Sequence, residues 1–427
     1  MHYARLVSNL TIRGVTTYNG KRRDLHVVGK KFGDAKGLGA TVIDGDGLIA
    51  LPGLVDPHCH LRTPGDRENP AETLVSGTAA AARGGYTCVA AMPNTTPACD
   101  NSGIALWLRN QTKDLSARVV PIGAVTKDRA GEQLADLRGM INAGVRVFSD
   151  DGAAVDSLDM LRLAAIALHL YATVADHCQS PVLAGPRAWW PDCLDGAEPP
   201  ADEIWYQSAE TGIVLRDVQV AKETGCHIHL CHISCAESVD VIRWAKKRRI
   251  LVSAEVTPHH LLLTSDLVAG GDTRFKVNPP LRSAEDVEAL REGLADGTID
   301  MVATDHAPHL AAAKDKPIAD AAPGMTGLEQ ALAVVMQTMV NTGRIPWQRL
   351  ADVMSFKPSH RLLHLRNQGC ELEPGEPANL VLINPQRRHI VDPEDTASLS
   401  RNNPYAGLDL PDPVELTVYA GRVTYQR

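Results

Sequence analysis

The feature that most constrains the fold of this sequence is a series of eight short apolar runs, separated by helix-like segments, between residues 53 and 345. The runs cover residues 54–60, 87–93, 119–125, 145–150, 173–178, 227–234, 251–258 and 301–306. Continuous rather than alternating hydrophobicity is typical of parallel strands that are buried on both faces. Eight strand-then-helix units predict an α/β fold of the (β/α)8 barrel type, over residues 53–365.

Helix signals lie between these runs, and different signals lie outside them. Residues 71–83 form an Ala-rich segment closed by two glycines, and residues 237–247 and 285–294 are amphipathic, so we predict three helices there. Residues 1–52 and 366–427 show Val/Ile/Thr-rich alternation broken by Gly and Pro, which is typical of antiparallel strands. Neither flank is long enough to bury a core alone. We therefore predict one small β-sandwich built from both terminal segments.

Composition excludes several classes of function. The formal net charge is -8, and the longest basic block is residues 246–249, so no nucleic-acid-binding face is expected. No segment approaches the roughly 18 apolar residues of a membrane helix, and the first residues lack the apolar core of a secretory signal. The nine cysteines form no CxxC pair and are interpreted as reduced thiols. We expect a cytoplasmic protein that acts on a small molecule, without a nucleic-acid or membrane partner.

Five of the eight predicted strands end in His or Asp, and barrel enzymes carry their catalytic groups at these ends. His58 and His60 are two residues apart on a strand, so both imidazoles face the same side. The other polar groups at strand ends are Asp150 and Asp151, His177, His232, and Asp305. Histidines and carboxylates together are ligands that Zn²⁺ accepts, and a bridging carboxylate would allow two ions. Only one of the two neighbouring aspartates can face the barrel lumen.

The remaining histidines and the tryptophans have structural interpretations. His259 and His260 are interpreted as structural hydrogen-bonding groups, and His227 and His229 as core residues deeper in their strand. His306 follows Asp305 and should point away from it. Trp189, Trp190 and Trp205 are interpreted as packing or interface residues.

Four motifs resemble one known family. They are GLVDPHCHLRTPG at residues 53–65, MPNTTP at 92–97, VNPPLR at 277–282 and ATDHAPH at 303–309, supported by PANL at 377–380 and NNPY at 402–405. These motifs resemble the dihydroorotases of the amidohydrolase superfamily, among those the type I bacterial form. The HxH pair alone indicates only the superfamily, whereas HLRxPG together with MPNT and NPPLR is much more specific.

The resemblance implies a set of roles for residues of this sequence. A first zinc ion would be held by His58, His60 and Asp305, and a second by His177 and His232, giving two zinc ions per chain. Many relatives bridge the ions with a carboxylated lysine on strand four; that lysine is absent here, and the resemblance assigns the bridge to Asp151, with Asp150 as the alternative. Arg62, Asn94, Asn278 and His309 would bind the substrate. Arg62 suits its carboxylate because a guanidinium forms two parallel hydrogen bonds.

The resemblance also implies the reaction. It is the reversible cyclisation of N-carbamoyl-L-aspartate to L-dihydroorotate in pyrimidine biosynthesis, in which a metal-bound hydroxide attacks the ring amide and Asp305 shuttles the proton. A homo-oligomer and an association with aspartate transcarbamoylase are expected.

Two other functions stay open as alternatives. A hydantoinase or allantoinase would open a different cyclic amide, but the missing lysine together with Arg62 and Asn94 argues against it. A catalytically silent barrel that serves as a scaffold for a partner enzyme is expected to lose metal ligands, whereas all of them are present.

Overall fold

Eight parallel strands form a closed ring in the computed structural model, which describes residues 9–33, 41–180, 183 and 204–427. The strands are β6 (Leu54–Cys59), β7 (Tyr86–Ala91), β8 (Arg118–Pro121), β9 (Val147–Phe148), β10 (Thr173–Asp176), β11 (Ile228–Leu230), β12 (Val252–Val256) and β13 (Met301–Val302). They pair in chain order within two parallel sheets, β6 to β8 and β9 to β13. Parallel bridges from Gly123 to Phe148 and from Cys59 to His306 join the two sheets. The predicted barrel is thus confirmed.

The last of these junctions lies between the first and the last strand. The Asp305 N–H donates to the His58 carbonyl at 3.0 Å, and the His60 N–H donates to the His306 carbonyl at 2.8 Å. The buried carboxylate of Asp56 also accepts from the Thr304 N–H at 2.9 Å and from its hydroxyl at 2.6 Å. Residues that carry the predicted site chemistry therefore form the closing seam of the barrel.

Helices lie around the outside of the ring and in the loops that follow its strands. They are α1 (Leu74–Arg83), α2 (Ser102–Arg109), α3 (Leu137–Asn142), α4 (Leu158–Leu168), α6 (Ile204–Thr224), α7 (Ala236–Lys247), α8 (Pro258–Leu262), α9 (Ala284–Asp296), α10 (Ala311–Lys314), α11 (Ala331–Val335) and α12 (Trp347–Ala351). The predicted helices at 71–83, 237–247 and 285–294 are confirmed as α1, α7 and α9. The Ser283 hydroxyl caps the first turn of α9, and Gly297 ends it with a φ of 88° that favours glycine.

The barrel interior holds its own hydrophobic cluster, separate from the larger core between strands and helices. Most barrel strands contribute one or two side chains to it, and two leucines from the segment after α12 complete it. The members are Val55, Cys88, Ala90, Met92, Val120, Ile122, Val147, Ala175, Cys231, Met301, Leu362 and Leu363. The interior is thus a packed core.

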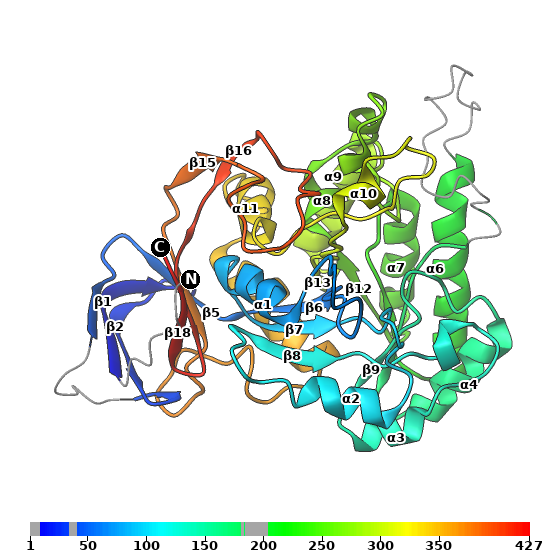
Figure 1. The fold of residues 1–427 in the computed structure, drawn as a ribbon, viewed down its shortest axis with the longest axis horizontal. Coiled ribbons are helices and arrows are strands. Elements are labelled where there is room, and N and C mark those ends of the chain that lie inside the picture. Colours follow the sequence, from blue (N-terminus) through cyan, green and yellow to red (C-terminus); the bar gives the residue numbers. More distant parts are fainter. Residues whose placement is uncertain (1–8, 34–40, 181–182, 184–203) are drawn as a thin grey trace.

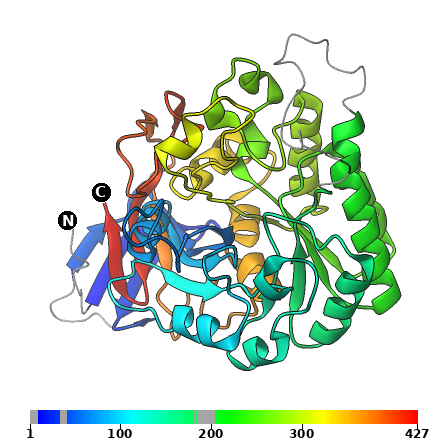
Figure 2. The same ribbon diagram turned by 45° about the vertical axis from the view of Figure 1, so that its right-hand side comes forward.

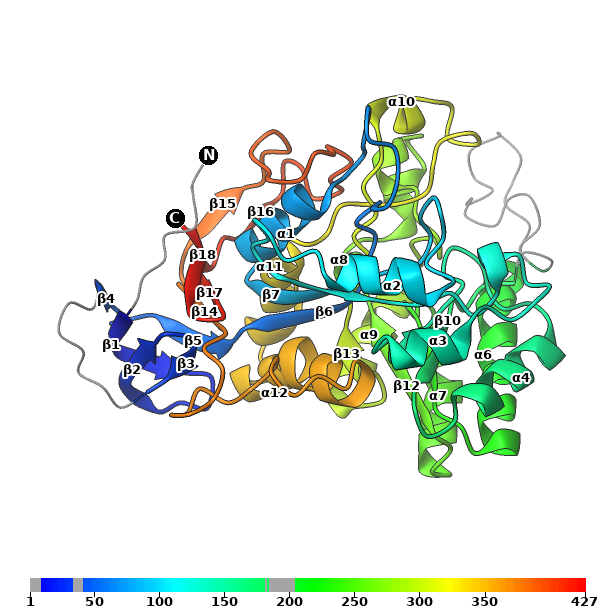
Figure 3. The same ribbon diagram turned by 60° about the horizontal axis from the view of Figure 1, so that its bottom comes forward.

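Both terminal segments combine in one sheet beside the barrel, as the sequence predicts (Figures 1 and 2). Its strands are β1 (Asn9–Thr17), β2 (Arg22–Val28), β3 (Lys31–Phe32), β4 (Thr41–Asp44), β5 (Ile49–Pro52), β14 (Leu380–Ile383), β17 (Val414–Tyr419) and β18 (Arg422–Gln426). The sheet order is β18-β17-β14-β5-β1-β2-β3, and β4 also pairs with β1. A separate two-stranded pair, β15 (Arg388–Ile390) and β16 (Asp409–Pro411), lies nearby. Figure 3 shows α4, α6 and α7 on the side of the barrel farthest from the terminal sheet.

The expectation of purely antiparallel pairing in the flanks is wrong for two pairs of strands. β1 pairs in parallel with both β4 and β5, while the other pairs of this sheet are antiparallel. β4 and β5 both lie along the edge of β1 opposite β2, β4 beside residues 10–13 and β5 beside residues 16–17.

The expectations about cysteines, membrane spans, tryptophans and domain boundaries remain. The cysteines of the described residues are free and buried. None of the described helices combines the length and the apolar character that a membrane span requires. Residues 1–8 and 34–40 of the predicted sandwich, Trp189, Trp190 and the side chain of Trp205 lie outside the description. The domain boundaries at 52/53 and 365/366 stay a prediction.

Candidate active site

The predicted site residues of β6 meet the residue that follows β13. The rings of His58 and His60 lie 5.4 Å apart, as expected for two imidazoles on one face. His60 Nε2 is 3.0 Å from Asp305 Oδ1, and His58 Nε2 is 3.6 Å from the same oxygen. The three side chains are buried. They form one half of a histidine and carboxylate cluster at the carboxyl ends of the strands.

The other half of the cluster gathers around Asp151, after β9. His177 Nδ1 and His232 Nε2 lie 3.4 Å and 3.3 Å from Asp151 Oδ1, and the two nitrogens are 2.9 Å apart. Asp151 also reaches His58 Nε2 and His60 Nε2, both at 3.4 Å. Asp151 is therefore the carboxylate that faces both halves.

Asp150 has different neighbours. One of its oxygens accepts from the N–H groups of Val125 at 2.9 Å and Thr126 at 3.0 Å, and the other accepts from the Thr126 hydroxyl at 2.5 Å. The two aspartates point to opposite sides of the strand end, as the alternation of side chains requires. Asp150 thus holds the loop after β8 and does not join the cluster.

The cluster fits the chemistry of a metal centre. His58 Nε2 is buried and has no hydrogen-bond partner among the described residues, although carboxylate oxygens surround it. Three groups of described residues place their ligand atoms within 4.8 Å of one another: His58, His60 and Asp305; His58, Asp151 and His232; and His58, Cys231 and Glu255. Buried imidazole and carboxylate ligands in this number match a zinc site.

The charges of the site match a cation. Burial would raise the pKa of Asp151, but the charge of His58 and the hydrogen bonds from His177 and His232 hold the pKa of this carboxyl well below its usual range. Burial acts likewise on Asp305, and the hydrogen bond from His60 with the neighbouring imidazole charges holds its pKa below the usual range. Both carboxylates are therefore ionised at physiological pH.

Two members of the cluster have strained backbones. His232 has a φ of 33° and Asp305 a φ of 46°, in the region that side chains other than glycine rarely adopt. Such conformations cost about 1–3 kcal/mol each and concentrate at functional sites. These bends follow β11 and β13, and the polar side chain at each bend lies at the common centre.

The predicted substrate-binding residues surround the cluster. Asn94 Oδ1 accepts from His60 Nδ1 at 2.8 Å, and Asn278 Nδ2 is 3.1 Å from His177 Nε2. Arg62 Nε donates to the Pro308 carbonyl at 3.2 Å, which leaves its terminal nitrogens for a ligand, although one lies 3.4 Å from His309 Nε2. The structure thus brings all the predicted site residues to one end of the barrel.

His309 is neutral at this position. Burial and the adjacent charge of Arg62 lower the pKa of His309 to about 3. Its Nε2 lies 2.9 Å from the Pro323 carbonyl, to which it donates. Because the ring is uncharged, it adds no positive charge beside the guanidinium of Arg62.

Sequence reasoning missed Glu255, a buried carboxylate of β12. Its two oxygens lie 2.7 Å from His58 Nδ1 and 3.0 Å from His229 Nε2. The hydrogen bonds continue from His229 Nδ1 to the Ser253 hydroxyl, which also contacts His227 Nε2, each at 2.8 Å. His227 and His229 thus belong to a polar column inside the barrel. The sequence signal that could have identified Glu255 is its position as the single carboxylate in the apolar run 251–258.

Arg129 was also missed. Its guanidinium donates to the Asp151 carbonyl at 2.7 Å, and its charge contributes to a lowered pKa of Arg62, which is caused mainly by burial. No sequence pattern singles it out. His306 contacts Glu72 at 3.3 Å, and His260 contacts Thr257 at 2.8 Å. These contacts agree with the structural roles that the sequence predicts for both histidines.

The fold and this cluster together define a class, the metal-dependent hydrolase barrels. The amidohydrolase family model matches residues 194–424, and the dihydro-orotase-like model matches residues 47–238. The L-hydantoinase from Arthrobacter aurescens, at 24% identity, superimposes with a TM-score of 0.82 over 98% of this chain and 96% of its own. The dihydropyrimidinase from Brevibacillus agri, at 20% identity, also has a TM-score of 0.82, with coverage of 98% and 95%. At these identities the likeness concerns the fold.

Relatives in sequence are more specific. The dihydroorotase of Leifsonia xyli subsp. xyli is 46% identical over 97% of this chain and 95% of its own length. The dihydroorotase of Mycobacterium tuberculosis is 44% identical over 97% and 98%. The chain belongs to the dihydroorotase family of amidohydrolases and is a metal-dependent cyclic amide hydrolase.

Proposed function

We propose that this chain interconverts N-carbamoyl-L-aspartate and L-dihydroorotate, with loss or gain of water, as the ring-closing step of pyrimidine biosynthesis. The observation that carries the proposal is the meeting of Asp151 and Asp305 with four histidines beside the guanidinium of Arg62. Such a site can hold cations against an amide while a fixed cation binds the carboxylate of the same small molecule.

The residues fit two zinc ions. His58, His60 and Asp305 would hold one, His177 and His232 the other, and Asp151 would contact both. When bound, zinc acts as a Lewis acid that polarises the amide carbonyl and lowers the pKa of water toward about 7.

Neighbouring acceptors fix the orientation of the β6 histidines. Glu255 accepts from His58 Nδ1 and Asn94 accepts from His60 Nδ1, so both rings present Nε2 to the site. Acceptors of this kind fix the tautomer of a ligating imidazole and raise its basicity. His58 and His60 are thereby oriented so that Nε2 of each ring can coordinate an ion once it carries no proton.

Asp305 is the proposed proton carrier. In ring opening its carboxylate takes the proton released by the attacking water and delivers it to the leaving ring nitrogen. In ring closure the same carboxylate accepts the proton of the carbamoyl nitrogen, as reversibility requires. Its position beside both β6 histidines supports this role.

Substrate orientation falls to the residues around the cluster. The two terminal nitrogens of Arg62 would bind the carboxylate bidentately, and the amide nitrogen of Asn94 remains available because its oxygen is taken by His60. Asn278 Oδ1 is buried without a hydrogen-bond partner among the described residues, which suits an acceptor for a ring N–H. Neutral His309 lies on the other side of Arg62.

The experiment is a two-direction assay of the purified, zinc-loaded chain. We expect turnover of L-dihydroorotate and N-carbamoyl-L-aspartate, and none of hydantoin or dihydrouracil, which lack the carboxylate. Arg62→Lys keeps the charge but loses the planar fork, so it should raise KM more than it lowers kcat. Turnover of the carboxylate-free rings at an equal rate would contradict the proposal.

The expected partners are proposed on resemblance alone. A homo-oligomer and a complex with aspartate transcarbamoylase are tested by light scattering of the chain alone and with that enzyme. A monomer that does not change mass on mixing would contradict both. The cytoplasmic location stays a prediction.

A further inference from the structure

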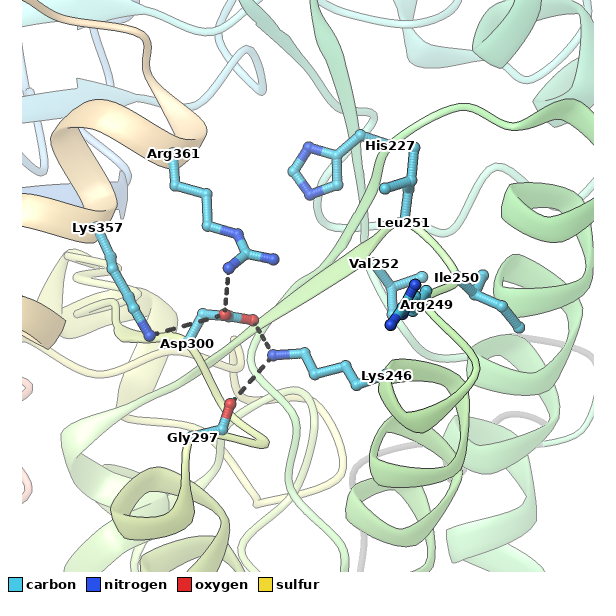
Figure 4. Close-up of a pocket in the computed structure, with 10 residues that line it drawn as sticks. All are labelled: His227, Lys246, Arg249, Ile250, Leu251, Val252, Gly297, Asp300, Lys357 and Arg361. Carbon is cyan, nitrogen blue, oxygen red and sulfur yellow. Dashed lines mark hydrogen bonds and ion pairs between the residues drawn. The ribbon is translucent and has the colours of Figure 1, made fainter.

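A second pocket lies at the opposite end of the barrel from the metal cluster. It has a volume of about 510 Å³ and opens where β11, β12 and β13 begin (Figure 4). Its lining residues are His227, Lys246, Arg249, Ile250, Leu251, Val252, Gly297, Asp300, Lys357 and Arg361. The volume is in the range of small-molecule sites. None of the charged residues here takes part in the proposed reaction.

The lining carries four cations and one carboxylate. Lys246 Nζ lies 2.5 Å from Asp300, Arg361 lies 3.2 Å from it and Lys357 lies 3.9 Å from it (Figure 4). Asp300 is only 1% exposed and also accepts from the Ala254 N–H at 3.0 Å. One fixed carboxylate therefore draws three cations together and neutralises one charge.

The other neighbours do not balance the remaining charge. Asp352 lies 3.5 Å from Lys357, but it pairs more closely with Arg349, at 2.6 Å. Arg249 is exposed and has no ion-pair partner within the described part of the chain. With Arg349 and Asp352 counted, the five cations around the pocket exceed the two carboxylates by three.

The excess of positive charge contributes to lowered pKa values of two basic groups in the pocket, Lys246 and His227. Burial lowers the pKa of Lys246, and the charges of Arg361 and Lys357 lower it further against the attraction of Asp300. Burial and repulsion from His229 and Arg361 lower the pKa of His227 to about 3, so this ring adds no charge. Its two nitrogens face Ser253 and Thr173, at 2.8 Å and 3.1 Å.

We propose that this pocket binds a small multivalent anion of the phosphate class. The two guanidiniums offer planar pairs of donors that match phosphate oxygens, and the two ammonium groups add point charges. Asp300 acts as the anchor that holds Lys246, Lys357 and Arg361 around the pocket before the anion arrives. The pocket volume restricts the ligand to a small molecule.

The test is calorimetric titration of the zinc-loaded chain with inorganic phosphate at constant ionic strength. Arg361→Gln and Arg249→Gln each remove one charged donor, and each should weaken phosphate binding by roughly tenfold or more. Arg344→Gln is the matched control, because Arg344 pairs with Glu288 at 2.7 Å outside the pocket. It should leave the phosphate affinity unchanged.

Separate measurements distinguish this site from the metal centre. Zinc content and dihydroorotate turnover should be the same in both pocket variants as in the parent chain, since neither residue contacts the cluster. Chloride at the same ionic strength should not displace phosphate. Equal phosphate affinities in the parent, both pocket variants and the control would overturn the proposal, and so would the absence of any binding heat at millimolar phosphate.

Discussion

Replacement of Glu255 by glutamine should weaken zinc binding without unfolding the barrel. The carboxylate contacts two imidazoles, His58 at 2.7 Å and His229 at 3.0 Å, and is 1% exposed. Glutamine keeps the shape, and its oxygen can still accept from His58 while its amide group faces His229. The negative charge that raises the basicity of His58 is lost.

The size of the effect follows from this contact. Loss of a partner that orients a ligating histidine costs about 10- to 100-fold in metal affinity, or roughly 1.4 to 2.7 kcal/mol. Because glutamine still satisfies both rings, the loss should fall on metal binding and only slightly on the free energy of unfolding. Glu255→Leu removes both hydrogen bonds and should instead destabilise the fold.

The assay is competition for zinc with a chromophoric chelator, followed by turnover at excess zinc. Glu72→Gln is the control, because Glu72 is equally buried and contacts a histidine, His306, outside the cluster. Glu255→Gln should bind zinc more weakly than Glu72→Gln and regain turnover as zinc is added. Equal zinc affinities of the two variants would refute the reasoning.

The remaining predictions concern protons, ligands and pH. Asp305→Asn keeps an oxygen ligand but cannot accept a proton, so zinc should stay bound while kcat falls by about 10²- to 10⁴-fold; metal analysis and steady-state kinetics on one preparation check this. Asp151→Ala should lower the zinc content, whereas Asp150→Ala should lower the melting temperature, because Asp150 holds the backbone of residues 125 and 126. If Asp150→Ala lowered the zinc content more than Asp151→Ala, the bridging ligand would be Asp150. Burial and the charge of Lys276 lower the pKa of Lys314 to about 7. The unfolded chain keeps that proton to higher pH, so stability should rise as pH increases above about 7, and Lys314→Met should flatten this rise in denaturant titrations.

The sequence predicts the barrel and the polar groups at its strand ends because both depend on local patterns. A parallel strand buried on both faces is apolar along its length, and His58 and His60 share a face whatever surrounds them. The amphipathic pattern likewise indicates α7 and α9 within one or two residues of their observed ends.

The rest depends on contacts between distant segments. Glu255 and Arg129 gain meaning only from neighbours that the fold brings to them, His58 from another strand and the carbonyl of Asp151. The parallel pairing of β1 with β4 and β5 is a contact between separate segments, which strand propensity does not encode. Resemblance to a family supplied the roles that spacing alone left open.

The closing seam of the barrel has a consequence for the folding of the enzyme during its synthesis. The N–H of Asp305 and the carbonyl of His58 form one of the bonds that join the last strand to the first, so the ring cannot close without bringing these two side chains together. A nascent chain that has not yet released residue 305 from the ribosome has five of the six cluster residues but lacks the contact that completes the centre. Closure of the ring and onset of catalytic activity should then occur together, and a partly folded barrel would be inactive.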